Sequence, residues 1–292
     1  MLLYEQIEKN KRKTIFIVAG FILFVMMIGA ALTYISYGEL YSGIIMATVI
    51  GGLYATFMVL SSTNVVMRMN HAKEVRSKND HPFLWNSVEN LAMVARIPQP
   101  KIYIINDPSP NAFATGITPK KGAVAVTTGL MNTLNREEIE GVLAHEVAHI
   151  RNYDIRLSTI AIALVSAVAL LSDIGARMIF FSRRGNNQKQ HPAVLIIAML
   201  LLMLSPVIAT MIKLAISRNR EYLADASAVE LTRNPNALAS ALQKITGVQT
   251  PVEEASSTSA PLYFADPLKK KAASLFSTHP PATERIRRLQ SM

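Results

Sequence analysis

Four long apolar runs interrupt an otherwise polar chain. The first spans 14–38 and the second spans 40–67, and each exceeds the roughly 20 apolar residues that a helix needs to cross a bilayer. The first run is also too long for the apolar core of a cleaved signal peptide, which has about 7–15 residues. The two runs therefore predict two uncleaved transmembrane helices at the N-terminal end.

Two further runs, 157–172 and 192–212, lie later in the chain and predict a second hydrophobic hairpin, 157–212. Asp173 and Arg177 stand four residues apart after the first of these runs. At that spacing their side chains share one helix face, so we expect them to pair near the membrane edge.

Polar sequence flanks the second hairpin on both sides. The two polar parts lie on the same side of the membrane whether that hairpin crosses twice or not at all, so they can build one domain. The predicted organisation is an N-terminal transmembrane hairpin, 1–67, the first part of the polar domain, 68–156, the second hydrophobic hairpin, 157–212, and the second part of the polar domain, 213–292.

Composition supports a membrane protein and narrows the chemistry. Half of the residues are hydrophobic and only 17% are charged, which excludes a disordered chain. The net charge is +10, but the basic residues cluster beside the apolar runs without interleaved aromatic residues, so topology explains them better than nucleic-acid binding. The chain has no Cys, so any metal must be held by His, Asp or Glu.

The distribution of Lys and Arg predicts the orientation. Basic residues precede the first run, at 9–13, and follow the second run from Arg68 onward, whereas Glu39 is the only charge between them. By the positive-inside rule, the N-terminus and the polar domain face the cytoplasm. The basic cluster at 183–189 fits this rule poorly if the second hairpin crosses fully.

A Ser-, Thr- and Pro-rich stretch, 247–267, predicts a mobile loop.

One helix carries the residues with the clearest chemistry. Asn135 and Glu138 form a capping-box pattern, and the predicted helix continues into His145, Glu146 and His149. In this H-E-x-x-H motif the two imidazoles share a face and can reach one metal ion, while Glu146 can reach a water bound to it. Two neutral His nitrogens with an open position suit catalytic zinc.

A third protein ligand has to come from elsewhere. Glu221 and Asp225 are four residues apart on a second predicted helix. Glu221 can ligate while Asp225 accepts a ring N–H from a ligating His. Spacing alone favours a solvated, salt-bridged helix over a ligand role.

The motifs together resemble a known family. L-A-H-E-V-A-H at 143–149 and R-N-R-E-Y-L-A-D at 218–225 are similar to the HtpX family of membrane-bound zinc endopeptidases, relatives of the CAAX prenyl proteases. N-A-F-A-T-G at 111–116, T-T-G-L at 127–130, and H-P-P with E-R-I at 279–286 also fit that pattern. The resemblance implies a mainly α membrane protein whose cytoplasmic, α-rich zincin-type metallopeptidase domain has a small β-sheet.

The resemblance also implies roles for individual residues. The implied ligands of one Zn²⁺ are His145, His149 and Glu221, with Glu146 as general base and Asp225 and Asp154 as partners of the ligands. His279 is a candidate donor to the oxyanion, although the prolines after it fit a structural turn equally well. The implied substrate-pairing strand comprises Asn111, Ala112, Phe113 and Ala114.

The expected activity is hydrolysis of peptide bonds in unfolded or misfolded membrane proteins, a quality-control role at the bacterial inner membrane. Such an enzyme could also cleave its own loop at 247–267, which we expect to be accessible. Two other interpretations remain open at this point. One is a membrane metal-binding scaffold without peptidase activity, in which Glu146 has no chemical role. The other is an ion carrier that uses Asp173 and Lys213, which is weaker because Lys213 lies at a span end where it can snorkel.

Overall fold

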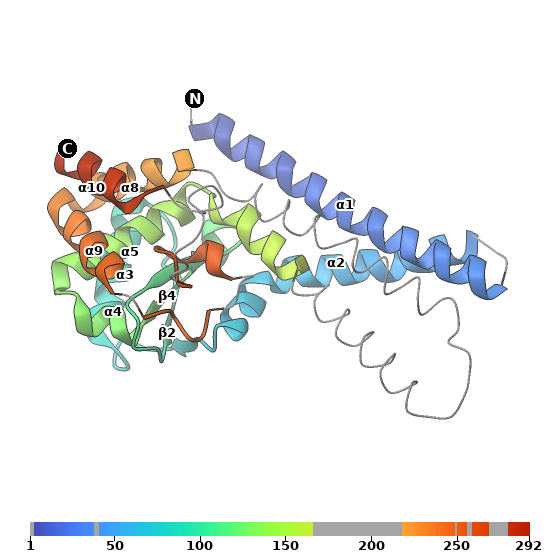
Figure 1. Ribbon diagram of the computed structural model, residues 1–292, viewed down its shortest axis with the longest axis horizontal. Helices are drawn as coiled ribbons and strands as arrows, with labels where there is room; N and C mark the ends of the chain where they lie inside the picture. Colours follow the sequence, from blue (N-terminus) through green and yellow to red (C-terminus); the bar gives the residue numbers. More distant parts are fainter. Residues whose placement is uncertain (1–2, 38–40, 166–217, 249, 256–258, 269–279) are drawn as a thin grey trace.

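Two long helices project from a compact α/β part in the computed structural model (Figure 1). The structure describes residues 3–37, 41–165, 218–248, 250–255, 259–268 and 280–292. The projecting helices are α1 (Leu3–Tyr37) and α2 (Tyr41–Met69), which contain the first two apolar runs. Among the described residues, one stretch is long and apolar enough to cross a bilayer, Ile44–Met69 within α2.

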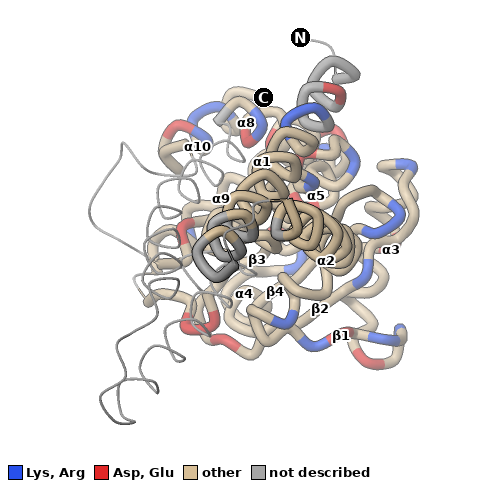
Figure 2. The backbone as a smooth tube through the Cα atoms, turned by 90° about the vertical axis from the view of Figure 1, so that its right-hand side faces the viewer, with Lys and Arg blue, Asp and Glu red and all other residues tan. Residues whose placement is uncertain are grey.

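The helices α1 and α2 pack against each other and against a third helical segment, Ile155–Val165. Their shared core includes Phe21, Met58 and Ile160. The opposite faces carry large apolar side chains that the protein leaves exposed, namely Ile15, Phe16, Leu23, Leu53, Phe57 and Leu60. In Figure 2 the coloured charges lie mainly on the compact part and at the N-terminal end of α1, whereas most of the two long helices is tan.

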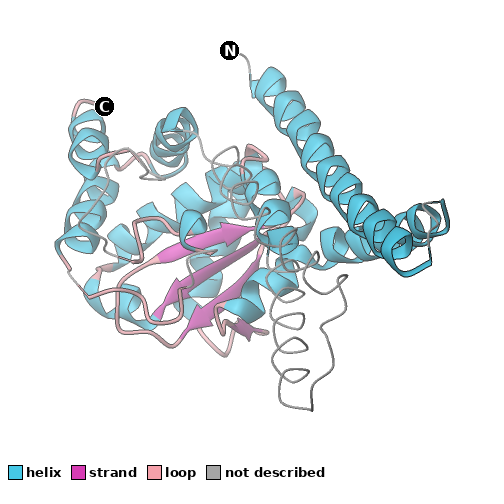
Figure 3. Ribbon diagram, turned by 45° about the vertical axis from the view of Figure 1, so that its right-hand side comes forward, coloured by secondary structure: helices cyan, strands magenta, loops and turns pink. Residues whose placement is uncertain are grey.

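A small mixed sheet forms the centre of the compact part (Figure 3). Its strands are β1 (Lys73–Val75), β2 (Lys101–Ile105), β3 (Ala112–Thr115) and β4 (Ala123–Thr127). The spatial order is β1-β2-β4-β3, in which β2 and β4 are parallel and the two outer pairings are antiparallel. β3 is therefore an end strand. Every residue of β3 and β4 is buried, as expected for strands covered on both faces.

Helices surround this sheet. They are α3 (Pro82–Ala95), α4 (Thr128–Thr133), α5 (Arg136–Arg151), α8 (Arg218–Thr232), α9 (Pro235–Gly247) and α10 (Ala282–Gln290), with short 3-10 turns η1 (Pro119–Lys121) and η2 (Ala260–Leu262). The largest core joins α3, α5 and α9 to one face of the sheet through residues such as Leu84, Val142 and Leu242. A second core on the other face includes Tyr103, Phe113 and Tyr263.

The prediction of a mobile loop at 247–267 is wrong for much of this stretch. Val252, Leu262, Tyr263 and Phe264 are buried, and the Asp107 carboxylate accepts hydrogen bonds from the backbone N–H groups of the residues that follow Val252. The hypothesis of self-cleavage in this stretch loses its basis there, because buried backbone is not available to an active site.

Several features predicted from the sequence lie outside the described residues. These are the Asp173–Arg177 pair, the basic cluster at 183–189, and the apolar run 192–212. The domain boundaries drawn from the hydrophobic pattern stay a prediction.

Candidate metal centre

Helix α5 begins with the capping box predicted from its sequence. The Asn135 side chain accepts from the Glu138 N–H, and the Glu138 carboxylate accepts from the Asn135 N–H, both at 2.9 Å. Glu138 also accepts from Ser240 at 2.6 Å and from Lys244 at 2.8 Å in α9. These contacts fix the start of α5 against α9, so the buried half of the helix that carries the H-E-x-x-H motif has a defined position.

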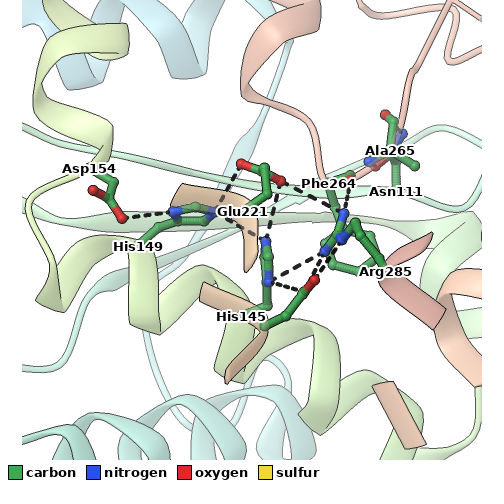
Figure 4. A network of polar contacts seen from close by, with 9 residues as sticks. Asn111, His145, His149, Asp154, Glu221, Phe264, Ala265 and Arg285 are labelled. Carbon is green, nitrogen blue, oxygen red and sulfur yellow. Dashed lines mark hydrogen bonds and ion pairs between the residues drawn. The ribbon is translucent and has the colours of Figure 1, made fainter. Parts of the chain in front are cut away.

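Three predicted ligands converge on one point between α5 and α8 (Figure 4). Potential ligand atoms of His145, His149 and Glu221 all lie within 4.8 Å of one another. The two imidazole Nε2 atoms are 3.1 Å apart. The Glu221 carboxylate lies 3.8 Å from Nε2 of His145 and 3.5 Å from Nε2 of His149.

Each imidazole is held from behind by a carboxylate, and Figure 4 labels the one behind His149, which is Asp154. Asp225 lies 3.0 Å from His145 Nδ1, and Asp154 lies 3.4 Å from His149 Nδ1. A carboxylate on Nδ1 keeps the proton on that nitrogen and turns the lone pair of Nε2 toward the centre. Both aspartates are buried, so water does not compete for these contacts.

The buried carboxylates shape the protonation of the rings. Burial disfavours the charged form of both imidazoles, and it lowers the pKa of His145 to about 4. At His149, hydrogen bonds to Asp154 and Glu221 outweigh burial and raise the pKa to about 10. Burial therefore favours the neutral form of His145, whereas the carboxylates around His149 favour its charged form.

Glu146 lies next to this group and points its carboxylate toward the sheet. It is 2% exposed, and it accepts a hydrogen bond from the backbone N–H of Ala114 in β3. Burial raises the pKa of Glu146 to about 7, which suits a group that takes and returns a proton near neutral pH.

A residue that the sequence analysis did not assign completes the centre. Arg285 in α10 is 2% exposed, and its guanidinium donates to both carboxylate oxygens of Asp225, at 2.8 and 2.7 Å. It also lies 3.7 Å from the Glu221 carboxylate. Burial opposes ionisation of Asp225, but the Arg285 charge and the His145 hydrogen bond outweigh it and lower its pKa to about 2.

The predicted substrate-pairing residues lie on the end strand β3 and directly before it. Asn111, Ala112, Phe113 and Ala114 are all buried, and the chain's own residues 263–265 lie along the outer edge of that strand. The strand borders the centre because Ala114 contacts Glu146. His279 lies outside the described residues.

The donor set fits zinc. Two nitrogen ligands about 2.0–2.1 Å from a tetrahedral zinc lie roughly 3.3 Å apart, close to the 3.1 Å between the two Nε2 atoms. Two imidazoles and one carboxylate are a known catalytic zinc set that leaves one position open. The carboxylate behind each ring, Asp225 or Asp154, supplies the orientation that such ligands need.

Comparison with known proteins identifies the family. A model of peptidase family M48 matches residues 80–292, which include α5, α8 and α10. The chain belongs to peptidase family M48. It is 57% identical to the protease HtpX homolog of Listeria monocytogenes serotype 4a (strain HCC23) and 48% identical to that of Leuconostoc citreum (strain KM20), with 100% of both chains covered in each case.

A solved structure of S. mikatae Ste24p is also similar to this M48 protein. The two are 21% identical with a TM-score of 0.49, and the match covers 98% of this chain and 66% of that chain.

The expected resemblance to HtpX proteases is confirmed. This M48 protein is a metalloprotease with zinc as its cofactor, and its His-His-Glu group is positioned to bind a metal ion. The family membership sets aside the alternative of a scaffold without peptidase activity. The ion-carrier alternative rests on Asp173 and Lys213, which lie outside the described residues.

Proposed function

We propose that this M48 protease is a membrane-embedded zinc endopeptidase that cleaves misfolded or damaged membrane proteins at the cytoplasmic face of the bacterial inner membrane. The observation that carries the proposal is the group formed by His145, His149 and Glu221 with Glu146 beside it. Its arrangement matches the needs of metal-assisted amide hydrolysis.

Each residue of the centre has a separate task in this proposal. His145, His149 and Glu221 hold the zinc, which activates a water molecule and polarises the scissile carbonyl when bound. Glu146 accepts the proton of the attacking water and returns it to the leaving amine. Asp225 and Asp154 hold the two imidazoles in the orientation that ligation requires, at 3.0 and 3.4 Å.

The substrate is an extended segment of polypeptide. Pairing with an end strand recognises the backbone rather than particular side chains, and β3 lies beside Glu146. Such recognition selects segments that have lost their own structure, which supports a role in removing misfolded proteins. His279 is proposed from the family resemblance as a donor to the oxyanion.

We propose that α1 and α2 both cross the membrane. Exposed apolar side chains such as Phe16 in α1 and Phe57 in α2 support this arrangement, because a water-soluble surface rarely carries so many. Arg12 near the start of α1 and Arg68 at the end of α2 place positive charge at the same end of the pair, as the positive-inside rule requires for the cytoplasmic side.

The decisive test is Glu146→Gln, which keeps the size of the side chain and removes its basicity. We expect zinc content to stay at one per chain while cleavage of an unfolded membrane-protein substrate falls by roughly 10²–10⁴-fold. Glu140→Gln is the matched control, because Glu140 is exposed on the same helix and accepts a hydrogen bond from the Ser87 hydroxyl at 3.2 Å. Unchanged cleavage by Glu146→Gln would refute the mechanism.

A further inference from the structure

The chain's own residues occupy the outer edge of β3. Tyr263 pairs with Phe113 as an antiparallel bridge, and the Phe264 N–H donates to the Ala112 carbonyl at 2.8 Å. The Asn111 side chain holds the next residue from both sides, donating to the Ala265 carbonyl at 3.0 Å and accepting from its N–H at 3.2 Å. Residues 263–265, which we call the internal strand, thus use the Ala112 carbonyl and the Asn111 side chain at this edge.

The internal strand also reaches the metal centre. The Phe264 ring stands edge-on to the His145 ring, with centroids 5.0 Å apart. The Phe264 carbonyl accepts from Arg285 at 3.3 Å, and the same guanidinium lies 4.8 Å from the centre of the Phe264 ring. An extended segment paired with β3 therefore sits beside a proposed zinc ligand and has its backbone carbonyl held by a buried cation.

We propose that the internal strand is a built-in occupant of the substrate edge, which must leave β3 before a substrate can pair there. The proposal rests on the function proposed above, because it assumes that β3 is the substrate-pairing strand. An antiparallel partner on this edge uses the Ala112 carbonyl and the Asn111 amide, and one edge accepts only one partner at a time. The closed arrangement is therefore autoinhibitory.

One polar anchor ties the internal strand to the membrane-proximal end of α2. Asn70, directly after α2, is buried, and its side-chain oxygen accepts from the Tyr263 hydroxyl at 3.0 Å and from the Ser259 hydroxyl at 2.8 Å. Its side-chain nitrogen donates to the Val66 carbonyl at 2.8 Å. Release of the internal strand breaks the hydrogen bond between Tyr263 and Asn70, so this anchor sets how readily the edge opens.

A reversible crosslink tests whether the internal strand has to move. The Phe264-to-Ala112 hydrogen bond flanks the Phe113–Tyr263 pair, which makes it a non-hydrogen-bonded pair with Cα atoms about 4.5 Å apart, within the disulfide range. In the Cys-free chain the double variant Phe113→Cys/Tyr263→Cys is oxidised with oxidised glutathione, and the crosslink is verified by mass spectrometry.

We expect the oxidised double variant to cleave an unfolded membrane-protein substrate at least roughly tenfold more slowly than the same protein after reduction, with equal zinc content. Equal rates in the two states would overturn the proposal. A different result, a wild-type protein whose cleavage of the substrate does not depend on Glu146, would instead refute the proposed function.

A second variant decides the matter even if the double variant folds poorly. Tyr263→Phe removes the hydroxyl bond to Asn70 and keeps the ring, so kcat/KM should rise roughly two- to tenfold, the effect of losing one hydrogen bond from the closed state. Tyr103→Phe is the matched control, because Tyr103 is buried on β2, away from the β3 edge, and we expect unchanged cleavage. No increase with Tyr263→Phe would contradict the autoinhibitory role.

Discussion

Asp225 shows how one side chain connects the ligands to the rest of the protein. Its carboxylate contacts His145 at 3.0 Å and takes two hydrogen bonds from Arg285. Without that carboxylate, the buried Arg285 guanidinium would be left with the longer contact to the Glu221 carboxylate, at 3.7 Å. Such stranded charges are costly, at about 3–5 kcal/mol in other proteins.

We predict that Asp225→Asn weakens zinc binding by roughly 10- to 100-fold, because His145 loses the carboxylate that orients it. The variant should also unfold at a lower temperature than the wild type. Competition with a zinc chelator measures the first effect, and thermal unfolding in detergent measures the second.

Asp154→Asn is the comparison for this prediction. Asp154 makes one longer contact with its imidazole, at 3.4 Å, so we expect a smaller loss of zinc affinity. Zinc binding and stability equal to the wild type in Asp225→Asn would show that Asp225 does not hold the site.

At this scale the sequence predicted the residues of the local motifs but not Arg285. His145, Glu146 and His149 follow from helical spacing within one segment, whereas Arg285 reaches Asp225 from 60 residues away. It stands in a run of charges, E-R-I-R-R, that is typical of a solvated helix. One signal was present, because Arg285 is four residues before Leu289 and therefore shares its buried face.

Among the elements, α4 depends on a very close approach of two backbone segments. The Gly129 N–H donates to the Asp107 carbonyl at 2.8 Å, and a Cβ at Gly129 would lie 2.0 Å from the Pro108 carbonyl oxygen. Backbone cannot rotate away as a side chain can. This contact explains why a glycine stands in the T-T-G-L segment before α5.

We predict that Gly129→Ala destabilises the protein by about 1–3 kcal/mol through overpacking. Gly247→Ala is the control, because a Cβ there meets nothing within 4 Å, and alanine is the better helix former. The measurement is the midpoint of thermal unfolding for both variants. A Gly129→Ala protein as stable as Gly247→Ala would contradict the close approach.

The local sequence predicted the elements themselves better than it predicted which elements lie next to one another. The capping box of α5 and the helix that carries Glu221 were expected, because caps and helical spacing act within a few residues. The internal strand was not, since its pairing with β3 joins residues more than a hundred positions apart. The Ser-, Thr- and Pro-rich composition around it indicated a mobile loop, and long-range hydrogen bonds to Asn70 and Asn111 overrode that local preference.

For the whole molecule, the proposed topology places the two ends of α2 on opposite sides of the membrane. Tyr41 begins α2 and is 83% exposed, whereas α3 belongs to the peptidase part. The absence of Cys from the chain makes single-cysteine labelling specific.

We predict that Tyr41→Cys reacts with a membrane-impermeant maleimide in intact cells, and that Asn90→Cys, on the exposed face of α3, reacts only after the membrane is permeabilised. Labelling of both positions from the same side would contradict the two-span arrangement. Labelling with the sides exchanged would reverse the proposed orientation while leaving the two spans intact.

The separation of His145 from Arg285 by 140 residues has a consequence for biosynthesis. Glu221, Asp225 and Arg285 all follow the second hydrophobic hairpin, 157–212, in the chain. A ribosome therefore has to translate that hairpin before the residues that complete the zinc centre exist. In the proposed topology, a nascent chain therefore enters the membrane before its zinc centre can form, and the centre is complete only after translation has passed α10.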